Sequence, residues 1–303
     1  MPNDEAVNAV DKVRHASALQ LAGMAKWATD FECRKCLHSI ADTVENCFAT
    51  ISQLAQLGQF RPVFKIALEE GDSPGFQELP PLRIGFYALA ANPMHWGHIL
   101  VGLTAMATMR LDKVIFIIAG ADERKPTMVS AETRHRLSRS VLETFHPLFA
   151  YCPIALGTNF DGERNFGRLL ELNLLQPMEA FYIAGGDHYR RTTPQGEPDT
   201  IQKLEMVVEA QQRVGAESHA ISVVFVDREA EMKKRDRVDT FLNIHVLPPI
   251  PLSFSSTAAR KALCKDAFCV DLVSLPYSCL LEIRTDGLYS GKAECLDQLE
   301  SPI

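Results

Sequence analysis

Two histidines three positions apart, His95 and His98, are the side chains of this chain best placed to do chemistry. They flank Gly97 and stand directly before apolar residues with helical spacing, at positions 99, 100, 103, 106 and 107. An apolar run, Arg83 to Ala88, and a proline turn precede them. The segment therefore predicts a strand, a loop and a helix, with the His-x-Gly-His at the helix N-terminus.

A helix N-terminus carries unpaired backbone N–H groups and the positive end of the helix dipole, which together attract anions. The imidazoles of His95 and His98 would add directed donors, and Gly97 would let a ligand approach the backbone closely. The pattern thus favours phosphate chemistry. Two other interpretations stay open for the histidine pair alone: zinc ligands, although no third ligand is fixed nearby, or ordinary polar side chains.

A second segment, Pro251 to Arg260, places a cluster of hydroxyls before a short helical stretch. Ser255 is expected to cap this helix, and Ser256 and Thr257 would offer hydroxyl and N–H groups at its start. Arg260 lies about one turn further along. The segment predicts a second phosphate cradle, with a capping serine and a solvated arginine as the alternative. Both segments follow apolar, strand-like runs, which favours the phosphate interpretation.

Together the two segments resemble the nucleotidylyltransferase superfamily, which is marked by a His-x-Gly-His and a downstream Ser-Ser-Thr-x-x-Arg. Within it, the chain is most similar to nicotinate/nicotinamide mononucleotide adenylyltransferases. Further pieces follow in the same order: Lys125-Pro126 with Arg134 and Arg136 (a basic substrate loop), Phe181 to Asp187 (a strand ending in Gly-x-Asp), and Leu275 to Tyr289 (a C-terminal signature). The resemblance covers about Leu82 to Gly291.

The resemblance implies an adenylyltransferase that joins ATP to nicotinate or nicotinamide mononucleotide and releases pyrophosphate. It assigns catalysis to His95, His98 and Arg260. It assigns nucleotide binding to Gly85, Phe86, Gly97, Asp187, Ser255, Ser256 and Thr257, and acceptor binding to Asn92, Lys125, Arg134 and Ile201. Mg²⁺ is expected mainly on the phosphates, because it keeps its waters and needs few protein ligands.

Two departures from the family pattern concern the acceptor. Ala88 to Ala91 replace the family's Gly-Gly-Thr/Ser-Phe and narrow a loop that normally contacts substrate. Ile201 takes the place of a tryptophan that stacks on the pyridine ring, so Ile201→Trp is expected to lower the acceptor KM. These departures leave two alternatives: a relative that uses another phosphorylated acceptor or CTP, and a nucleotide-binding protein without turnover.

Composition limits the classes of partner. The formal net charge of −7 argues against broad nucleic-acid binding, so local basic groups would hold the polyanionic substrate. No apolar stretch reaches membrane-spanning length, and the polar N-terminus is unlike a signal peptide. The eight scattered cysteines fit a reduced cytoplasm, where we expect the protein. Cys33-x-x-Cys36 is a weak metal candidate, and a homo-oligomer stays open.

The chain divides into a helical module with its linker, 1–81, and a nucleotidylyltransferase domain, 82–303. In the module, apolar residues recur every three or four positions from Leu37 to Leu57, and a Pro/Gly-rich linker follows. Beyond it, strand-like runs alternate with helical stretches, which predicts an α/β, Rossmann-like, doubly wound parallel sheet with an N-terminal helical extension. If that extension is an appendage, a chain beginning near Pro80 should stay folded. The charge run Glu229 to Asp239 predicts a solvated loop.

Overall fold

The computed structural model describes residues 4–62, 66–69, 72, 81–121, 128–158, 161–174, 176–213, 219–226, 237–250, 252, 254–265 and 268–290. Lys125, Pro126 and residues 229–236 of the charge run lie outside these ranges, so the predictions made for them stay predictions. None of the helices in the described part of the chain combines the length and the apolar content that a bilayer span requires.

A six-stranded, all-parallel sheet forms the centre of the molecule, in the order β3-β2-β1-β4-β5-β6. The strands are β1 (Leu82–Leu89), β2 (Lys113–Ile118), β3 (Phe149–Cys152), β4 (Met178–Gly185), β5 (His219–Val226) and β6 (Asn243–Leu247). The order is that of the Rossmann fold, so the predicted α/β doubly wound sheet is confirmed. Strand β3 was not expected, because its four residues are too few to show a pattern.

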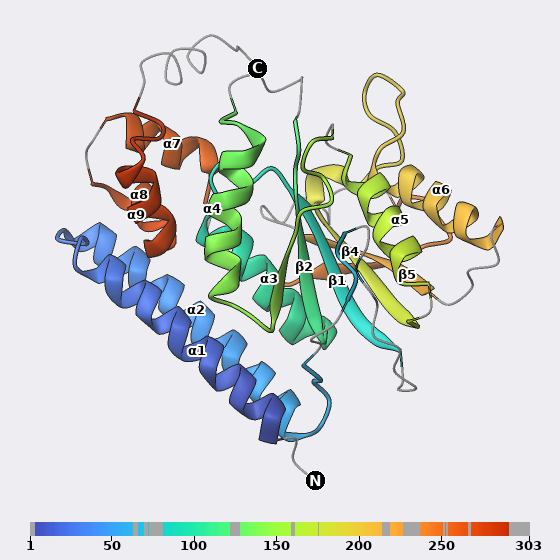
Figure 1. Ribbon diagram of the computed structural model, residues 1–303, viewed down its shortest axis with the longest axis horizontal. Coiled ribbons are helices and arrows are strands. Elements are labelled where there is room, and N and C mark those ends of the chain that lie inside the picture. Colours follow the sequence, from blue (N-terminus) through green and yellow to red (C-terminus); the bar gives the residue numbers. More distant parts are fainter. Residues whose placement is uncertain are drawn as a thin grey trace.

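Helices cover both faces of the sheet and bury two separate apolar clusters (Figure 1). One face packs against α3 (Trp96–Met109), α4 (Ala131–Glu143) and the C-terminal helices α7 (Ser256–Cys264), α8 (Val270–Val273) and α9 (Tyr277–Thr285). The other face packs against α5 (Gly162–Leu172) and α6 (Thr200–Arg213). Alternate residues of a strand point to opposite faces, so Phe86 lies in the second cluster and Tyr87 in the first.

The N-terminal residues form two long helices, α1 (Asp4–Ala25) and α2 (Phe31–Gln56), which pack side by side (Figure 1). Asp30 caps α2 by accepting a hydrogen bond from the Cys33 N–H at 2.8 Å. The predicted apolar stripe of α2 is confirmed from Leu37 to Leu54 and is buried against α3 and α8, whereas Leu57, just after the helix, is 62% exposed. Its residues belong to the same apolar cluster as α3 and the sheet, so no separate core divides the described helices from the rest.

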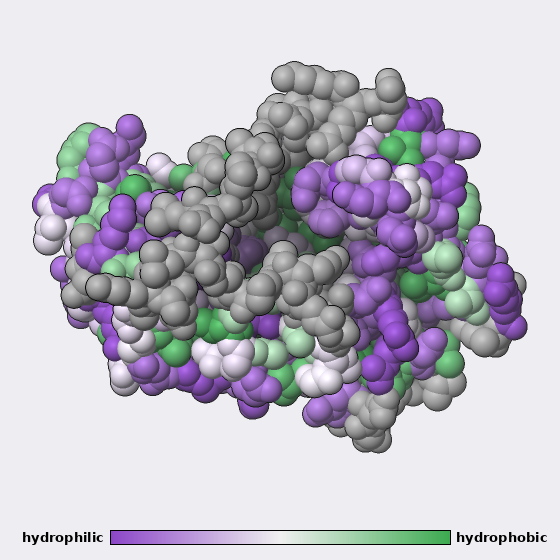
Figure 2. Space-filling model, turned by 90° about the horizontal axis from the view of Figure 1, so that it is seen from above, coloured by the Kyte–Doolittle hydropathy of each residue, from purple (hydrophilic) through white to green (hydrophobic). Residues whose placement is uncertain are grey.

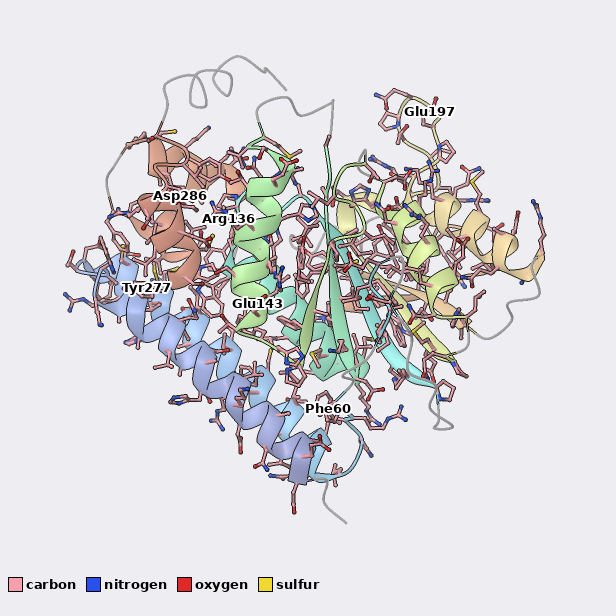
Figure 3. All side chains as sticks on the ribbon, in the orientation of Figure 1. Phe60, Arg136, Glu143, Glu197, Tyr277 and Asp286 are labelled. Atoms are coloured by element: carbon pink, nitrogen blue, oxygen red, sulfur yellow. The ribbon has the colours of Figure 1, made fainter. Side chains whose placement is uncertain are left out.

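Specific contacts also join α1 to the C-terminal helix α9. A Cβ added at Gly23 would lie 2.4 Å from the Tyr277 ring, so this glycine allows the ring to pack directly on the α1 backbone (Figure 3). Next to it, the Ser278 N–H donates to Gln20 Oε1 at 2.8 Å. The helical extension therefore packs on the core of its own chain.

The chain reverses its winding direction between β1 and β4, which lie side by side with Tyr87 opposite Ile183. In open parallel sheets, ligands bind beyond the carboxyl ends of the strands at such a point, because the loops there diverge to opposite faces. The His-x-Gly-His segment follows β1, and Asp187 follows β4. Figure 2 looks onto the molecule from above this edge and shows a depression with hydrophobic residues at its base.

Candidate functional site

The two histidines stack on each other at the start of α3. His95 is the N-cap residue, with an extended backbone, and His98 lies in the first turn. Their ring centroids are 3.8 Å apart and their planes differ by 22°. Both side chains are largely buried, at 3% exposed for His95 and 8% for His98. The loop and helix predicted around them are confirmed.

A backbone hydrogen bond fixes the tautomer of His98. The His95 N–H donates to His98 Nδ1 at 3.2 Å, so this ring nitrogen is an acceptor. In the neutral imidazole the other nitrogen, Nε2, must then carry the proton. The proton of the neutral His98 ring therefore lies on the edge that faces away from the His95 backbone.

Gly97 is required by the histidine pair itself. A Cβ at this position would lie 2.9 Å from two atoms of the His95 ring and 3.3 Å from Phe254 Cβ. Any larger residue at position 97 would therefore displace the His95 ring or Phe254. The group that approaches the Gly97 backbone closely in the structure is the protein's own imidazole, and the approach of a ligand at this glycine stays a prediction.

The second motif is bonded to the loop that carries the first. Ser256 Oγ donates to the Pro93 carbonyl at 3.0 Å, and Arg260 Nη1 donates to the Asn92 carbonyl at 2.6 Å. Arg260 Nη2 also donates to Thr257 Oγ1 at 3.2 Å. The predicted helix is confirmed as α7, with Ser255 at its N-cap position, although the Ser255 side chain makes no capping hydrogen bond. The tertiary structure thus places the N-termini of α3 and α7 at one site.

Arg260 is half buried where the two motifs meet. Burial lowers the pKa of its guanidinium, and the neighbouring Tyr289 acts in the opposite direction. Arginine nevertheless stays charged in proteins at neutral pH. The arrangement therefore holds a permanent positive charge next to the N-terminus of α7, which is what a polyphosphate site requires.

Asp187 lies at the end of the neighbouring strand β4, in a single 3₁₀ turn, Gly186–His188. Its side chain is 78% exposed, so the carboxylate is accessible to a ligand. A Cβ added at Gly185 would lie 2.3 Å from Asp187 Oδ1, so only glycine allows the carboxylate to fold back over the strand end. This geometry is compatible with the predicted contact between Asp187 and a nucleotide.

Sequence reasoning missed a charged network that follows Asp187. Asp199 accepts hydrogen bonds from His188 Nδ1 at 3.0 Å, from Arg190 Nε, and from the Thr200 N–H at 2.8 Å. Burial alone would raise the pKa of Asp199, but these donors outweigh it and hold the pKa below its ordinary value. The network ties the loop after β4 to the start of α6, a link between residues 11 positions apart that spacing did not reveal.

Arg134 has a different role from the predicted one. Its side chain is 1% exposed, and its guanidinium donates to four main-chain carbonyls: Val129 at 3.1 Å, Ala90 and Ala119 at 2.8 Å, and Gly120 at 2.5 Å. These bonds join the loops that follow β1 and β2. The expectation that Arg134 binds the acceptor phosphate is therefore corrected, because its donors are used inside the protein.

Arg136, the neighbouring member of the predicted basic loop, is also paired within the protein, at the surface. It pairs with Glu282 and Asp286 and so joins α4 to α9, as Figure 3 shows for Asp286. Surface ion pairs of this kind contribute little to stability, up to about 1 kcal/mol. The two carboxylates do, however, neutralise the Arg136 guanidinium, which the sequence had suggested as part of a substrate-binding loop.

Gly85 and Phe86 support the sheet and do not reach the site. A Cβ at Gly85 would lie 2.8 Å from Leu111 and 3.1 Å from Ile183. The missing side chain of this glycine therefore leaves room for the side chains of Leu111 and Ile183 to pack against β1. Phe86 is fully buried and makes an edge contact with Phe166 at 4.9 Å between centroids. Their predicted role in nucleotide binding is corrected to core packing.

Ile201 is likewise in the core. It lies in the first turn of α6, is 0% exposed, and belongs to the apolar cluster on that face of the sheet. A side chain enclosed in this way has no surface to offer to a pyridine ring. The assignment of Ile201 to acceptor binding is therefore corrected, although the absence of a stacking tryptophan at this position stands.

The variant Ile201→Trp should consequently destabilise the protein. Adding an indole where no space is free costs about 1–3 kcal/mol through forced rotamers and backbone shifts. Chemical denaturation should show a lower midpoint, while the acceptor KM should not improve. Ile201→Leu, which conserves volume, is the matched control and should cost less than about 1.5 kcal/mol. A lower acceptor KM with unchanged stability would restore the interpretation made from the sequence.

The space beside His95 is small in this structure. A cavity of about 20 Å³ lies there, lined by His95, Gly97, Val101, Val226, Ile250, Leu252 and Phe254. The Phe254 ring makes an edge contact with His95 at 6.3 Å between centroids. The cavity suffices for one water molecule but not for a nucleotide, so a ligand at His95 would have to displace the Phe254 side chain.

The thiol pair of the N-terminal region, Cys33 and Cys36, lies in the first turns of α2. Burial raises the pKa of the Cys33 thiol to about 12, and its hydrogen bond with Asp30 acts in the same direction. Among the residues that the structure describes, no three His, Cys, Asp or Glu side chains gather as a ligand set.

Comparisons with known proteins point to one group of enzymes, although no protein-family model matches the chain. A "Probable nicotinate-nucleotide adenylyltransferase" of Desulfitobacterium hafniense (strain Y51) is 26% identical over 216 residues, covering 69% of this chain and 97% of that protein. Another, from Methylibium petroleiphilum, is 25% identical over 186 residues, covering 61% and 80%. Among solved structures, Plasmodium falciparum nicotinic acid mononucleotide adenylyltransferase complexed with NaAD has a TM-score of 0.49 at 15% identity, covering 69% and 97%.

The bacterial matches and the site agree. The match to the Desulfitobacterium protein extends over nearly its whole length. The two superfamily motifs of this chain, separated by more than 150 residues, are brought together by the hydrogen bonds of Ser256 and Arg260. The chain therefore shows distant homology to the nicotinate-nucleotide adenylyltransferases.

Proposed function

We propose that the protein transfers the adenylyl group of ATP to a phosphorylated acceptor, nicotinate or nicotinamide mononucleotide, forming a dinucleotide and pyrophosphate. One observation carries the proposal: Ser256 and Arg260 of the second motif are hydrogen bonded to the Asn92–Pro93 loop of the first. Two helix N-termini, two imidazoles and a guanidinium thus converge at the switch point of a parallel sheet. That combination suits a triphosphate.

The reaction needs no protein nucleophile. An oxygen of the acceptor phosphate attacks the α-phosphorus of ATP, a new P–O bond forms, and the bond from Pα to the bridging oxygen of the β-phosphate breaks. The electron pair leaves with pyrophosphate. Because the attacking oxygen is already anionic, catalysis rests on alignment and on stabilising the charge that develops on the phosphoryl oxygens.

The histidine pair would stabilise that charge. His98 offers an N–H at Nε2, because its Nδ1 accepts from the His95 backbone. This donor would be directed at an α- or β-phosphate oxygen, with His95 stacked against it. A fixed donor needs no reorganisation when the charge develops, so its hydrogen bond should be stronger in the transition state than with bound ATP.

The second motif would hold the β- and γ-phosphates as they become pyrophosphate. The first N–H groups of α7, from Ser256 and Thr257, have no partner within the helix. Arg260 supplies a charge there, and the exposed hydroxyl groups of Ser255 and Thr257 can add hydrogen bonds. Asp187, open to solvent at the end of β4, would accept hydrogen bonds from the adenosine part.

Mg²⁺ would enter with ATP and be carried mainly by the phosphates. The described residues fit this mode, since no three His, Cys, Asp or Glu side chains among them gather as a cage for the ion. Mg²⁺ commonly keeps several waters and uses one or two carboxylates.

The acceptor is the part of the proposal with a rival. Arg134 is used inside the protein and Ile201 is buried, so two of the expected acceptor contacts are not available. These observations favour, as a second candidate, a transferase of the same superfamily with a different phosphorylated acceptor, or with CTP in place of ATP.

A pyrophosphate-release screen tests both candidates. ATP and CTP are each offered with a panel of phosphorylated acceptors that includes nicotinate and nicotinamide mononucleotide, with Arg260→Ala as the inactive control. We expect release with ATP and one of these two mononucleotides, and a dinucleotide product by mass spectrometry. Release only with another acceptor would favour the rival transferase. Nucleotide binding without release from any pair would reject the enzymatic proposal.

A further inference from the structure

Tyr289 reaches the site from the C-terminal end of the described chain. Its hydroxyl donates to Asn92 Oδ1 at 2.9 Å, across 197 positions of sequence. The tyrosine is 1% exposed, and its φ of 60° lies in the left-handed region that bulky residues seldom adopt. A residue persists in that conformation only where its surroundings fix it, as the buried ring and the hydroxyl bond do here.

The bond decides which way the Asn92 amide points. An amide has an oxygen end and a nitrogen end, and Tyr289 occupies the oxygen end. The nitrogen end, Nδ2, is therefore turned away from Tyr289, and no described residue accepts a hydrogen bond from it. An asparagine held in this way presents two N–H donors in a fixed direction.

The location of Asn92 indicates which ligand group its amide N–H donors would contact. Its own carbonyl accepts from Arg260, and the loop continues over three residues to His95. Asn92 thus lies between the two groups to which the proposed function assigns the phosphates of ATP. A neutral amide with outward N–H groups suits a phosphate oxygen at this place, whereas a freely rotating amide would present its oxygen half of the time.

The geometry points to Tyr289 as a positioning residue that aims the Asn92 amide N–H groups at the phosphates of the bound nucleotide. This inference rests on the proposed function for its kinetic consequence, but its binding consequence can be measured without turnover. The C-terminal signature, which the sequence identified only as a family resemblance, thereby acquires a physical role, because it orients a donor of the first motif.

The kinetic test is Tyr289→Phe, which removes one hydroxyl and keeps the ring. We expect kcat with ATP and the reactive acceptor to fall about fivefold to tenfold, with both KM values changed less than about twofold. Tyr277→Phe, which removes the hydroxyl of another tyrosine near the start of α9, is the matched control and should leave kcat unchanged. In the Asn92→Ala background, Tyr289→Phe should cost nothing further. A full additional loss in the double variant would overturn the inference.

The binding test uses protein labelled with ¹⁵N at asparagine. The side-chain NH₂ signals of Asn92 are identified by their absence from Asn92→Ala, and Tyr289→Phe should move them. ATP and pyrophosphate should shift them in the full chain, whereas adenosine should not. If the Asn92 NH₂ signals shift with neither ATP nor pyrophosphate, or shift equally with adenosine, the inference is overturned even if the enzyme turns over. Shifts with ATP and pyrophosphate but no product from any acceptor would reject the proposed function alone.

Discussion

Replacing His98 with alanine should lower kcat by about 10² or more, with a much smaller change in ATP affinity. The Nε2 N–H of His98 is fixed in direction by the bond from the His95 backbone to Nδ1. A preorganised donor of this kind contributes mainly when charge develops on the phosphoryl oxygens, so its loss affects kcat more than binding. Steady-state kinetics and calorimetric ATP titration together measure the two effects.

His38→Ala is the matched control, because His38 is an exposed histidine on α2, far along the chain from both motifs. It should leave turnover unchanged. His95→Ala should behave like His98→Ala, since the two rings form one stacked pair. Arg260→Ala should raise the ATP KM as well as lower kcat, because it removes a charged phosphate contact. Near-normal turnover in either histidine variant would remove the proposed mechanism.

A chain that begins at residue 80 should not fold cooperatively. The sequence alone suggested an appendage that could be removed, but the apolar face of α2 lies in one continuous cluster with α3 and the C-terminal helices. Removing it would expose the facing surface of α3, and the loss from several large buried side chains would exceed the whole stability of an ordinary domain. We expect aggregation and no cooperative thermal transition by circular dichroism.

A single substitution in the full chain tests whether α2 completes the core without shortening the chain. Phe48 is fully buried on α2, so Phe48→Ala in the full chain should lower the free energy of unfolding by about 3–5 kcal/mol. Leu19→Ala, at a position of α1 that is 59% exposed, should change it by less than about 0.5 kcal/mol. A shortened chain with a cooperative transition and normal activity would show that the helices are an appendage after all.

The sequence predicted the sheet well, because strands buried on both faces are continuous apolar runs that need no partner to be recognised. Five of the six strands lie where those runs were found, and β3 was missed because it has four residues. The stripe on α2 was equally clear from its spacing. Spacing could not say what the stripe covers, and that it completes the main core is a fact of packing alone.

At the site, the sequence identified residues by chemical type, and the fold decided which of them are available. His95, Ser256 and Arg260 were identified as parts of two local motifs, each recognisable from a helix start. Arg134 has the same charge as Arg260, yet four carbonyls from the loops that follow β1 and β2 enclose it. No local pattern records such an enclosure, because the carbonyls lie up to 44 residues away from Arg134 in the sequence.

The sequence by itself therefore indicated the residues that could bind phosphates, since a His-x-Gly-His and a Ser-Ser-Thr-x-x-Arg each carry their donors within the first two turns of a helix. The tertiary structure decided how those donors are aimed. The tautomer of His98 follows from a backbone N–H, and the direction of the Asn92 amide follows from a hydroxyl 197 residues away. Direction depends on contacts between distant segments, and such contacts exist only once the sheet has brought the ends of β1 and β4 together.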